Sequence, residues 1–337
     1  MKKLKVGVIG SGRIGKVHIE NLSVRISSAE VVAIADPFLE DAKKVAEQFG
    51  IKSVSADYKE ILNNSEIEAV LICSPTDTHS QCIIEAADAG KHIFCEKPLD
   101  LSLKKIQVIL NTVEKAGVKL MVGFNRRFDP NFSKVKQMVK NGKIGNPHIL
   151  KITSFDPMPP PPEYIFVSGG MFLDMTIHDF DMARFVIDSE VIEVYAKANV
   201  LIDPAIGKAG DVDTAITTLF FENGAIGTIA NSRQAVYGYD QRLEVFGSEG
   251  MVHVTNNTPD NHTYYNKLGS HSSLPLNFFM DRYTESYALE IEEFINAVIN
   301  NSEIPATGKD GLMSVAVGLA AKKSVAENRP VKLNEIL

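Results

Sequence analysis

Hydrophobic residues follow one pattern before residue 124 and a different one after it. In the first part, short apolar runs typical of buried strands alternate with helical patterns of about ten residues. The apolar runs lie at 5–9, 30–35, 69–74, 92–95 and 119–123. Strands that alternate with helices predict an α/β fold with a doubly wound parallel sheet and right-handed crossovers. We therefore expect a first domain at residues 1–123.

The remainder of the chain, residues 124–337, predicts an α+β domain with a large, open, mostly antiparallel sheet. A helical pattern at 130–141 and a proline-rich loop at 157–162 come first. Alternating runs typical of strands follow at 191–201, 214–221, 225–232, 242–247 and 250–255. The sequence Glu222-Asn223-Gly224 predicts a hairpin turn between two of them. Helical patterns at 285–300 and 311–327 close the chain.

The segment SGGMFLDMTIHDFD, at 168–181, reads as one helix with two parallel stripes. The apolar stripe consists of Leu173, Ile177 and Phe180. The polar stripe beside it consists of Asp174, His178 and Asp181. An imidazole titrates near neutral pH, and a carboxylate one turn away can orient it, so the polar stripe suits proton transfer. Two other interpretations stay open: a solvated helix face with ordinary ion pairs, or a metal site, although no second cluster at ligand spacing accompanies it.

A glycine-rich turn, Gly10-Ser11-Gly12-Arg13-Ile14-Gly15, joins the first strand to a helical pattern. In this context GxGxxG is typical of a dinucleotide-binding Rossmann domain, because the glycines allow a tight turn, approach of a pyrophosphate and helix–strand packing. Asp36 ends the second strand, 21 residues after Gly15. An acid there accepts hydrogen bonds from a ribose and repels a 2′-phosphate, which favours NAD over NADP. Alternatively, Asp36 only caps a turn with Pro37.

Other polar residues follow the later strands of the predicted parallel sheet. They are Ser74-Pro75-Thr76, Glu96-Lys97 and the segment 124–127. Ligands of such sheets bind beyond the carboxyl ends of the strands, so these positions are candidates for a site. Lys97 is either an ordinary exposed lysine or an ammonium that stabilises charge on a reacting oxygen.

Composition narrows the function classes. The length of 337 residues suggests about two domains, and the net charge of −7 without a long basic run argues against nucleic acid as a partner. Cys73, Cys82 and Cys95 fit neither a zinc site nor a redox pair, which favours a reducing cytoplasm. No apolar run approaches membrane-spanning length, so we expect no membrane partner.

Four motifs occur together in this sequence: GVIGSGRIG at 7–15, SPTDTH at 74–79, EKP at 96–98, and a GG-x3-D-x3-HD pattern at 169–179. Together they resemble the Gfo/Idh/MocA oxidoreductase family over essentially the whole chain. The segments 124–129, 155–164, 168–184 and 237–242 are most similar to the inositol 2-dehydrogenases of that family.

The resemblance implies a role for each candidate residue. The implied NAD contacts are Gly10, Gly12, Arg13, Ile14, Asp36, Ser74, Thr76, His79, Glu96 and Lys97. The implied catalytic set is Lys97, Asp174 and His178, with His178 as the general base and no metal. The implied substrate contacts are Arg127, Asp181, Tyr237 and, as a weaker candidate, Asp156. Family members are often cis at the Lys97–Pro98 bond and often assemble as homotetramers through the open sheet face.

The implied reaction is oxidation of one ring hydroxyl of a cyclic polyol, most simply myo-inositol to 2-keto-myo-inositol (scyllo-inosose), with hydride transfer to NAD. Three alternatives remain. The chain could be another sugar or polyol dehydrogenase of the family, a glycosidase that uses tightly held NAD, or a non-catalytic NAD sensor. Presence of Lys97 together with Asp174 and His178 argues against a sensor, whereas the fold alone would not.

Overall fold

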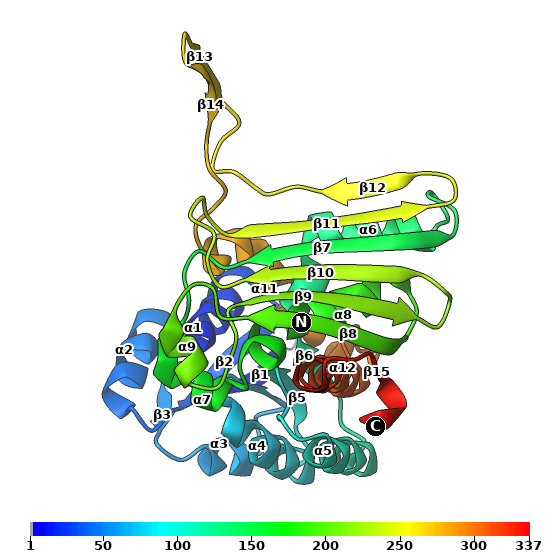
Figure 1. Cartoon of the computed structure of the whole chain (residues 1–337). Coiled ribbons are helices and arrows are strands. Elements are labelled where there is room, and N and C mark those ends of the chain that lie inside the picture. The colour runs from blue at the N-terminus through cyan, green and yellow to red at the C-terminus, as the bar shows by residue number, and fades with distance from the viewer. Residues whose placement is uncertain (1–2) are drawn as a thin grey trace. The chain divides into compact units, whose positions relative to one another are not determined.

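The computed structural model describes residues 3–337, apart from the side chain of Pro162, and its contacts group the chain into two compact units (Figure 1). Unit 1 comprises Met1–Phe128 and Glu285–Val315, and unit 2 comprises Asp129–Thr284 and Ala316–Leu337. The predicted domain boundary after residue 123 stays a prediction. The units differ from it because a late segment of the chain joins unit 1.

Unit 1 is built on a parallel sheet of six strands, as the alternation of strands and helices predicted. The strands are β1 (Leu4–Ile9), β2 (Ala29–Ala35), β3 (Ser53–Ser55), β4 (Ala69–Ile72), β5 (His92–Glu96) and β6 (Leu120–Gly123). Their order is β3-β2-β1-β4-β5-β6, and every pair is parallel. The strand order reverses between β1 and β4, which is where ligands bind in doubly wound sheets.

The sheet of unit 1 is nearly inaccessible because helices cover it. The helical segments are α1 (Arg13–Glu20), η1 (Asn21–Arg25), α2 (Leu39–Phe49), α3 (Lys59–Asn63), α4 (Thr76–Asp88), α5 (Leu103–Ala116), η2 (Asn125–Phe128), most of α11 (Thr284–Ile299) and the start of α12 (Gly308–Glu327). Phe294 of α11 contacts Phe94 of β5, with ring centroids 5.9 Å apart. The late segment therefore completes the core of this unit. The short elements β3 and α3 were not predicted.

Unit 2 contains a sheet of seven strands, and the predicted mostly antiparallel pairing is confirmed. The strands are β7 (Pro147–Phe155), β8 (Val191–Asn199), β9 (Thr214–Phe221), β10 (Ile226–Ser232), β11 (Asp240–Gly247), β12 (Met251–Val254) and β15 (Val331–Lys332). Their order is β12-β11-β7-β10-β9-β8-β15, and only the β7–β10 pair is parallel. We had not predicted β7, which lies in the interior of this sheet between β11 and β10.

Helices cover one face of the sheet in unit 2. Its helical segments are α6 (Pro130–Lys140), α7 (Pro162–Ser168), η3 (Met171–Met175), α8 (Ile177–Ile187), α9 (Pro204–Lys208), α10 (Phe279–Arg282), the part of α12 from Ala316 onward, and η4 (Leu333–Glu335). α8 contacts both β7 and α6, and α6 contacts β12 (Figure 1). A small hairpin of β13 (Thr263–Asn266) and β14 (Gly269–Ser272) extends beyond β12. Among residues 3–337, no helix is both long enough and apolar enough to span a bilayer.

Candidate active site

The glycine turn after β1 has three glycines in three different environments. Gly10 has φ +93°, and a Cβ there would lie 2.7 Å from the main chain of Ser74. A Cβ at Gly15 would lie 2.1 Å from the carbonyl oxygen of Gly10, because α1 packs directly on the turn. A Cβ at Gly12 would meet nothing within 4 Å. The first and third glycines are therefore required by the fold, and the second leaves open space beside the turn.

The start of α1 is available to an anion. Gly12 and Arg13 are exposed and Ile14 is half-buried. Gly12 is the N-cap of α1, and no side chain caps the helix. The first N–H groups of a helix have no partner within the helix, and the helix dipole favours negative charge there. This geometry fits a pyrophosphate.

Asp36 has two structural roles at the end of β2. Its Oδ2 accepts hydrogen bonds from the main-chain N–H of Ser11 at 2.7 Å and from the Ser11 hydroxyl at 2.9 Å. Its Oδ1 accepts from the N–H of Phe38 at 2.9 Å. The carboxylate therefore caps the turn, as the alternative interpretation held, and it also fixes the glycine turn. Since a carboxylate has about four acceptor positions, capacity remains for a ribose hydroxyl.

His79 connects the loops that follow β4 and β5. Its Nδ1 lies 2.7 Å from the carbonyl oxygen of Pro98, and its Nε2 lies 2.8 Å from that of Ser74. The pKa of His79 is lowered, because the effect of burial exceeds the opposite effect of the two carbonyl oxygens. Lys97 is half-buried, and the Lys97–Pro98 peptide bond is cis. His79, only 1% exposed, thus supports the loop that carries Lys97. Thr76, half-buried, is the first residue of α4.

A buried acidic cluster lies immediately before Lys97 in unit 1. The Nε2 of His18 is 2.7 Å from the Oε1 of Glu96, and Glu290 of α11 completes the group. Both carboxyl oxygens of Glu290 are buried without a hydrogen-bond partner, and burial, with the nearby Glu96, raises its pKa. Within residues 3–337, this is the one group of three side chains spaced closely enough to share a metal ion. Neither Asp174 nor His178 belongs to it.

Arg127 binds two residues of unit 1, Pro305 and Asp310. Its guanidinium donates to the carbonyl oxygen of Pro305 at 2.9 Å and pairs with Asp310 at 3.0 Å. Burial would raise the pKa of Asp310, but Arg127 and the groups of Thr307 lower it to about 2. The ion pair therefore holds Arg127 in place.

The prediction of a single helix over 168–181 is wrong. α7 ends at Ser168, and Gly169 and Gly170 follow with φ of +86° and +77°. A short π-helical turn, η3, then precedes α8. The two glycines adopt left-handed conformations that ordinary residues avoid, so they interrupt the helix. Such π-helical turns are frequent at functional sites.

The helical residues that follow the break are almost completely buried. In the range 171–184, every residue of which is described, only Asp174 of η3 and His178 of α8 are not fully buried. Asp181 is 1% exposed. The predicted apolar stripe is confirmed, because Leu173, Ile177 and Phe180 are all buried. The interpretation as a solvated helix face is wrong: an otherwise buried segment presents one carboxylate and one imidazole.

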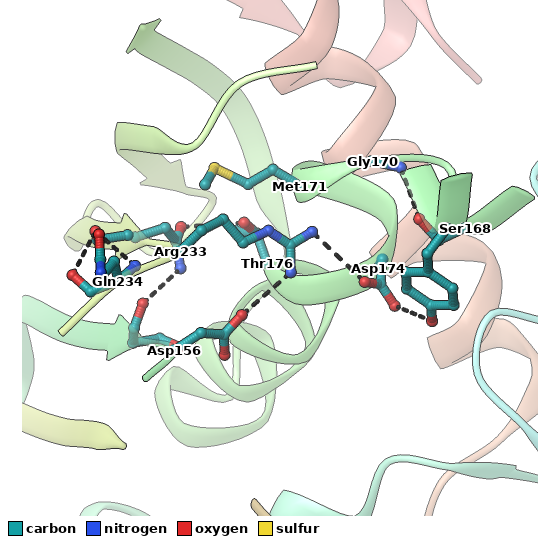
Figure 2. Close-up of polar contacts among 12 residues, drawn as sticks. Asp156, Ser168, Gly170, Met171, Asp174, Thr176, Arg233 and Gln234 are labelled. Carbon is teal, nitrogen blue, oxygen red and sulfur yellow. Dashed lines mark hydrogen bonds and ion pairs between the residues drawn. The ribbon is translucent and has the colours of Figure 1, made fainter. Parts of the chain in front are cut away.

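Asp174 is held by two side chains, neither of which we had predicted (Figure 2). Its Oδ1 accepts a hydrogen bond from the hydroxyl of Tyr164 at 3.2 Å, and its Oδ2 lies 3.5 Å from the Nη2 of Arg233. The Nη1 of Arg233 donates to Asp156 at 3.1 Å. Arg233 has no sequence motif around it, so only the structure reveals this contact. Asp156, an expected substrate contact, is thus paired with Arg233.

Tyr237 precedes β11 and is 38% exposed. Its hydroxyl donates to Asp240 at 2.7 Å, and Asp240 also pairs with Arg242 at 2.8 Å. Burial and the hydrogen bond to Asp240 raise the pKa of Tyr237. The hydroxyl is therefore neutral near pH 7 and stays available as an acceptor.

Comparison with known proteins identifies the family. A family model described as an oxidoreductase family with an NAD-binding Rossmann fold matches residues 4–124, and a model of the GFO/IDH/MocA C-terminal domain matches residues 132–253. The chain belongs to the Gfo/Idh/MocA oxidoreductase family. It is therefore an enzyme of the NAD-dependent oxidoreductase class.

Several characterised or solved relatives of this Gfo/Idh/MocA protein match over nearly their full length. A myo-inositol 2-dehydrogenase of Thermotoga maritima is 49% identical, covering 99% of this chain and 100% of the relative. An inositol 2-dehydrogenase of Rhizobium meliloti is 47% identical, with coverages of 98% and 99%. A crystal structure of scyllo-inositol dehydrogenase from Lactobacillus casei with NAD(H) and scyllo-inositol superposes with a TM-score of 0.92 at 30% identity, with coverages of 99% and 100%.

The residues of unit 1 fit the cofactor of the Gfo/Idh/MocA family. The open space at Gly12 and the uncapped start of α1 suit a pyrophosphate, and the acidic residue Asp36 directly follows β2. These features would hold NAD, which supplies a hydride acceptor when bound.

Proposed function

We propose that this protein oxidises a CH–OH group of a cyclic polyol, with myo-inositol as the preferred substrate and 2-keto-myo-inositol as the product. The names of the relatives support inositol as the substrate class. One observation carries the chemistry: the buried segment 171–184 leaves only Asp174 and His178 accessible. A carboxylate and an imidazole in that position suit removal of a hydroxyl proton.

The residues of the chain have separate tasks in the proposed reaction. The alcohol loses a proton and a hydride to become a ketone. His178 accepts the proton as general base, and Asp174 stabilises the imidazolium that forms. The ammonium of Lys97 stabilises the negative charge that develops on the oxygen. NAD, when bound, supplies the acceptor for the hydride.

Substrate contacts are proposed for Arg127 and Tyr237. The resemblance also implied Asp181, but its 1% exposure leaves it little surface for a substrate. Arg127 is fixed by Asp310, so its position costs little conformational entropy on binding. The hydroxyl of Tyr237 can accept a hydrogen bond from a substrate hydroxyl while it donates to Asp240. We assign Asp156 a different task, which follows from its pairing with Arg233.

A substrate panel with NAD and with NADP tests this proposal. We expect myo-inositol to give the highest kcat/KM, measured by absorbance of the reduced cofactor. Another polyol, scyllo-inositol included, oxidised about tenfold more efficiently would overturn the choice of substrate. Bound NAD without net reduction would indicate the glycosidase alternative. Lys97→Ala is the matched control, because it should bind NAD but oxidise each substrate about 10²–10³-fold more slowly.

We also propose a homotetramer, assembled through the open face of the sheet in unit 2. An apolar row crosses this face, because the strand registers place Met251, Phe246, Ile149, Ile226 and Phe220 side by side. The first four of these side chains are 43–49% exposed. Exposed apolar residues in such a row are typical of an interface between subunits.

Light scattering tests the assembly, with an expected mass of four chains. Phe246→Lys should dissociate the tetramer because it places a charge within the row, whereas Lys151→Glu, on the neighbouring row, should have a smaller effect. A wild-type monomer at micromolar concentration would overturn the proposal.

The expected cytoplasmic location remains a proposal. Cys73, Cys82 and Cys95 are free and buried in the structure. Free thiols are typical of a reducing compartment, which supports the expectation.

A further inference from the structure

Arg233 is a buried cation in a fixed position at the end of the central strands of unit 2. It follows β10 directly, is 4% exposed, and its main-chain N–H donates to the carbonyl oxygen of Asp213 at 2.8 Å. Asp156 follows the neighbouring strand β7. Its N–H donates to Ser232 at 2.9 Å, and its carbonyl oxygen accepts from Ala235 at 2.7 Å. The main chain therefore holds Arg233 and Asp156 beside each other.

The guanidinium of Arg233 is shared unequally among carboxylates (Figure 2). It lies 3.1 Å from Asp156 and 3.5 Å from Asp174. A third carboxylate, Asp211, binds the N–H of Met171 with oxygens at 2.9 and 3.1 Å, at the start of η3. Burial lowers the pKa of Arg233, but the carboxylates of Asp174, Asp156 and Asp211 outweigh burial. The pKa is therefore raised, and the group stays charged. Asp156 makes the shorter contact with the guanidinium, and Asp174 is the carboxylate that raises its pKa most through charge.

We propose that Arg233 is a positioning residue that fixes the carboxylate of Asp174, and that Asp156 is the counter-ion of Arg233 rather than a substrate contact. This inference rests on the catalytic roles proposed for Asp174 and His178. With Tyr164 on one carboxylate oxygen and Arg233 on the other, Asp174 has a defined orientation. A side chain held from two sides loses little entropy when the reaction requires that orientation.

The carboxylate of Asp156 offsets the effect that the positive charge of Arg233 would have on Asp174. A guanidinium beside Asp174 alone would cancel the negative charge that Asp174 offers to the imidazolium of His178. Because Asp156 pairs with the same guanidinium at the shorter distance, Arg233 orients Asp174 while the net charge of the three groups stays negative. Arg233 and Asp156 consequently have opposite effects on the charge near His178, and this difference can be measured.

The experiment compares Arg233→Gln with Asp156→Asn in the full-length protein by the pH dependence of kcat. Loss of the guanidinium leaves more negative charge near His178, so its pKa rises and the acidic limb moves to higher pH. Loss of the Asp156 charge leaves the guanidinium uncompensated, so the limb moves to lower pH. We expect displacements of about 0.5–1 pH unit in opposite directions. Arg233→Gln should also reduce kcat by up to about 10²-fold, because Asp174 is no longer fixed.

Two further variants separate positioning from a structural role. Arg233→Lys keeps the charge but not the planar fork, so it should restore the pH profile and only part of kcat. Arg184→Gln is the matched control, since Arg184 is a similarly buried arginine of unit 2 that pairs with Glu190. It should leave the acidic limb in place. If Arg233→Gln fails to fold, as judged by circular dichroism and NAD affinity, the limb of Asp156→Asn alone decides.

The inference is overturned if both variants keep the wild-type pH limb, if both limbs move in the same direction, or if Arg184→Gln moves the limb equally. These outcomes differ from failure of the proposed function. His178→Ala with normal kcat would remove the proposed base itself. An inactive His178→Ala together with an unmoved limb in Asp156→Asn would reject only the roles of Arg233 and Asp156.

Discussion

The cofactor features of unit 1 and the candidate catalytic residues of unit 2 are built in different ways. In unit 1 the cofactor features are made by the main chain: three glycines, one helix start and the strand ends. In unit 2 the candidate catalytic carboxylate is held by two side chains: Tyr164, ten residues before it, and Arg233, 59 residues after it. A main-chain site depends on local conformation, whereas a side-chain site depends on neighbours supplied by the fold. The two parts should therefore fail in different ways when they are mutated.

The largest expected effects come from the reacting groups, one in each unit. His178→Ala should lower kcat by about 10²–10⁴-fold, because the general base is lost. Lys97→Ala should lower it by about 10²–10³-fold, because charge on the oxygen is no longer stabilised. NAD affinity, measured by fluorescence titration, should change little. The double variant should lose less than the product of both effects, since the two groups act on one event.

Near-normal kcat in both of these variants, with NAD still bound, would contradict the catalytic assignment. The non-catalytic NAD sensor would then be the better interpretation.

A pair of glycine variants tests whether the cofactor site is a main-chain feature. Gly12→Ala meets no atom within 4 Å and has an ordinary φ of −65°, so it should fold normally. Its methyl group would occupy the space for the pyrophosphate, so the Kd for NAD should rise by about 10–100-fold. Gly15→Ala would collide with the carbonyl oxygen of Gly10 and should lower the free energy of unfolding by about 1–3 kcal/mol. Calorimetry and NAD titration of both variants check this, and equal destabilisation by the two would contradict it.

Cofactor choice should depend on one charge in unit 1. The wild-type enzyme should have a higher kcat/KM with NAD than with NADP. Asp36→Asn keeps an acceptor for the N–H of Phe38 but removes the charge that repels a 2′-phosphate. The ratio of kcat/KM with NAD to kcat/KM with NADP should therefore fall by about tenfold. A wild-type enzyme that uses both cofactors equally would show that Asp36 serves only the turn.

The smallest effect is expected from Glu290, which touches no proposed reacting group. Its pKa is raised in the folded protein, so the folded state holds a proton that the unfolded state releases above pH 4.5. Stability should consequently fall as the pH rises above that value. Glu290→Gln removes this dependence. The free energy of unfolding of the variant minus that of the wild type should therefore increase from pH 5 to pH 8. Urea unfolding at both values checks this, and parallel pH profiles would contradict it.

The same difference explains what the sequence could predict. Parallel strands and the glycine turn are visible because apolar runs and glycine spacing are local patterns. The break before η3 was missed, although Gly169-Gly170 was its signal, because the apolar stripe begins only after the two glycines and does not show where the helix starts. Arg233 could not be found, since its partners are 77 and 59 residues away along the chain. Pairings over such distances require the fold itself.

Unit 1 is made of two segments that are far apart in the chain, and this has a consequence for its folding during synthesis. Its second segment begins only after the 156 residues of 129–284, which belong to unit 2. At about 5–20 residues per second, a ribosome needs roughly 8–30 s to cross that interval. During this time Phe94 lacks Phe294, and His18 lacks the ring of Tyr287 that lies 5.9 Å from it in the folded protein. The core of unit 1 is therefore incomplete until residues 285–315 have been translated. The ability to bind NAD should consequently arise late in translation.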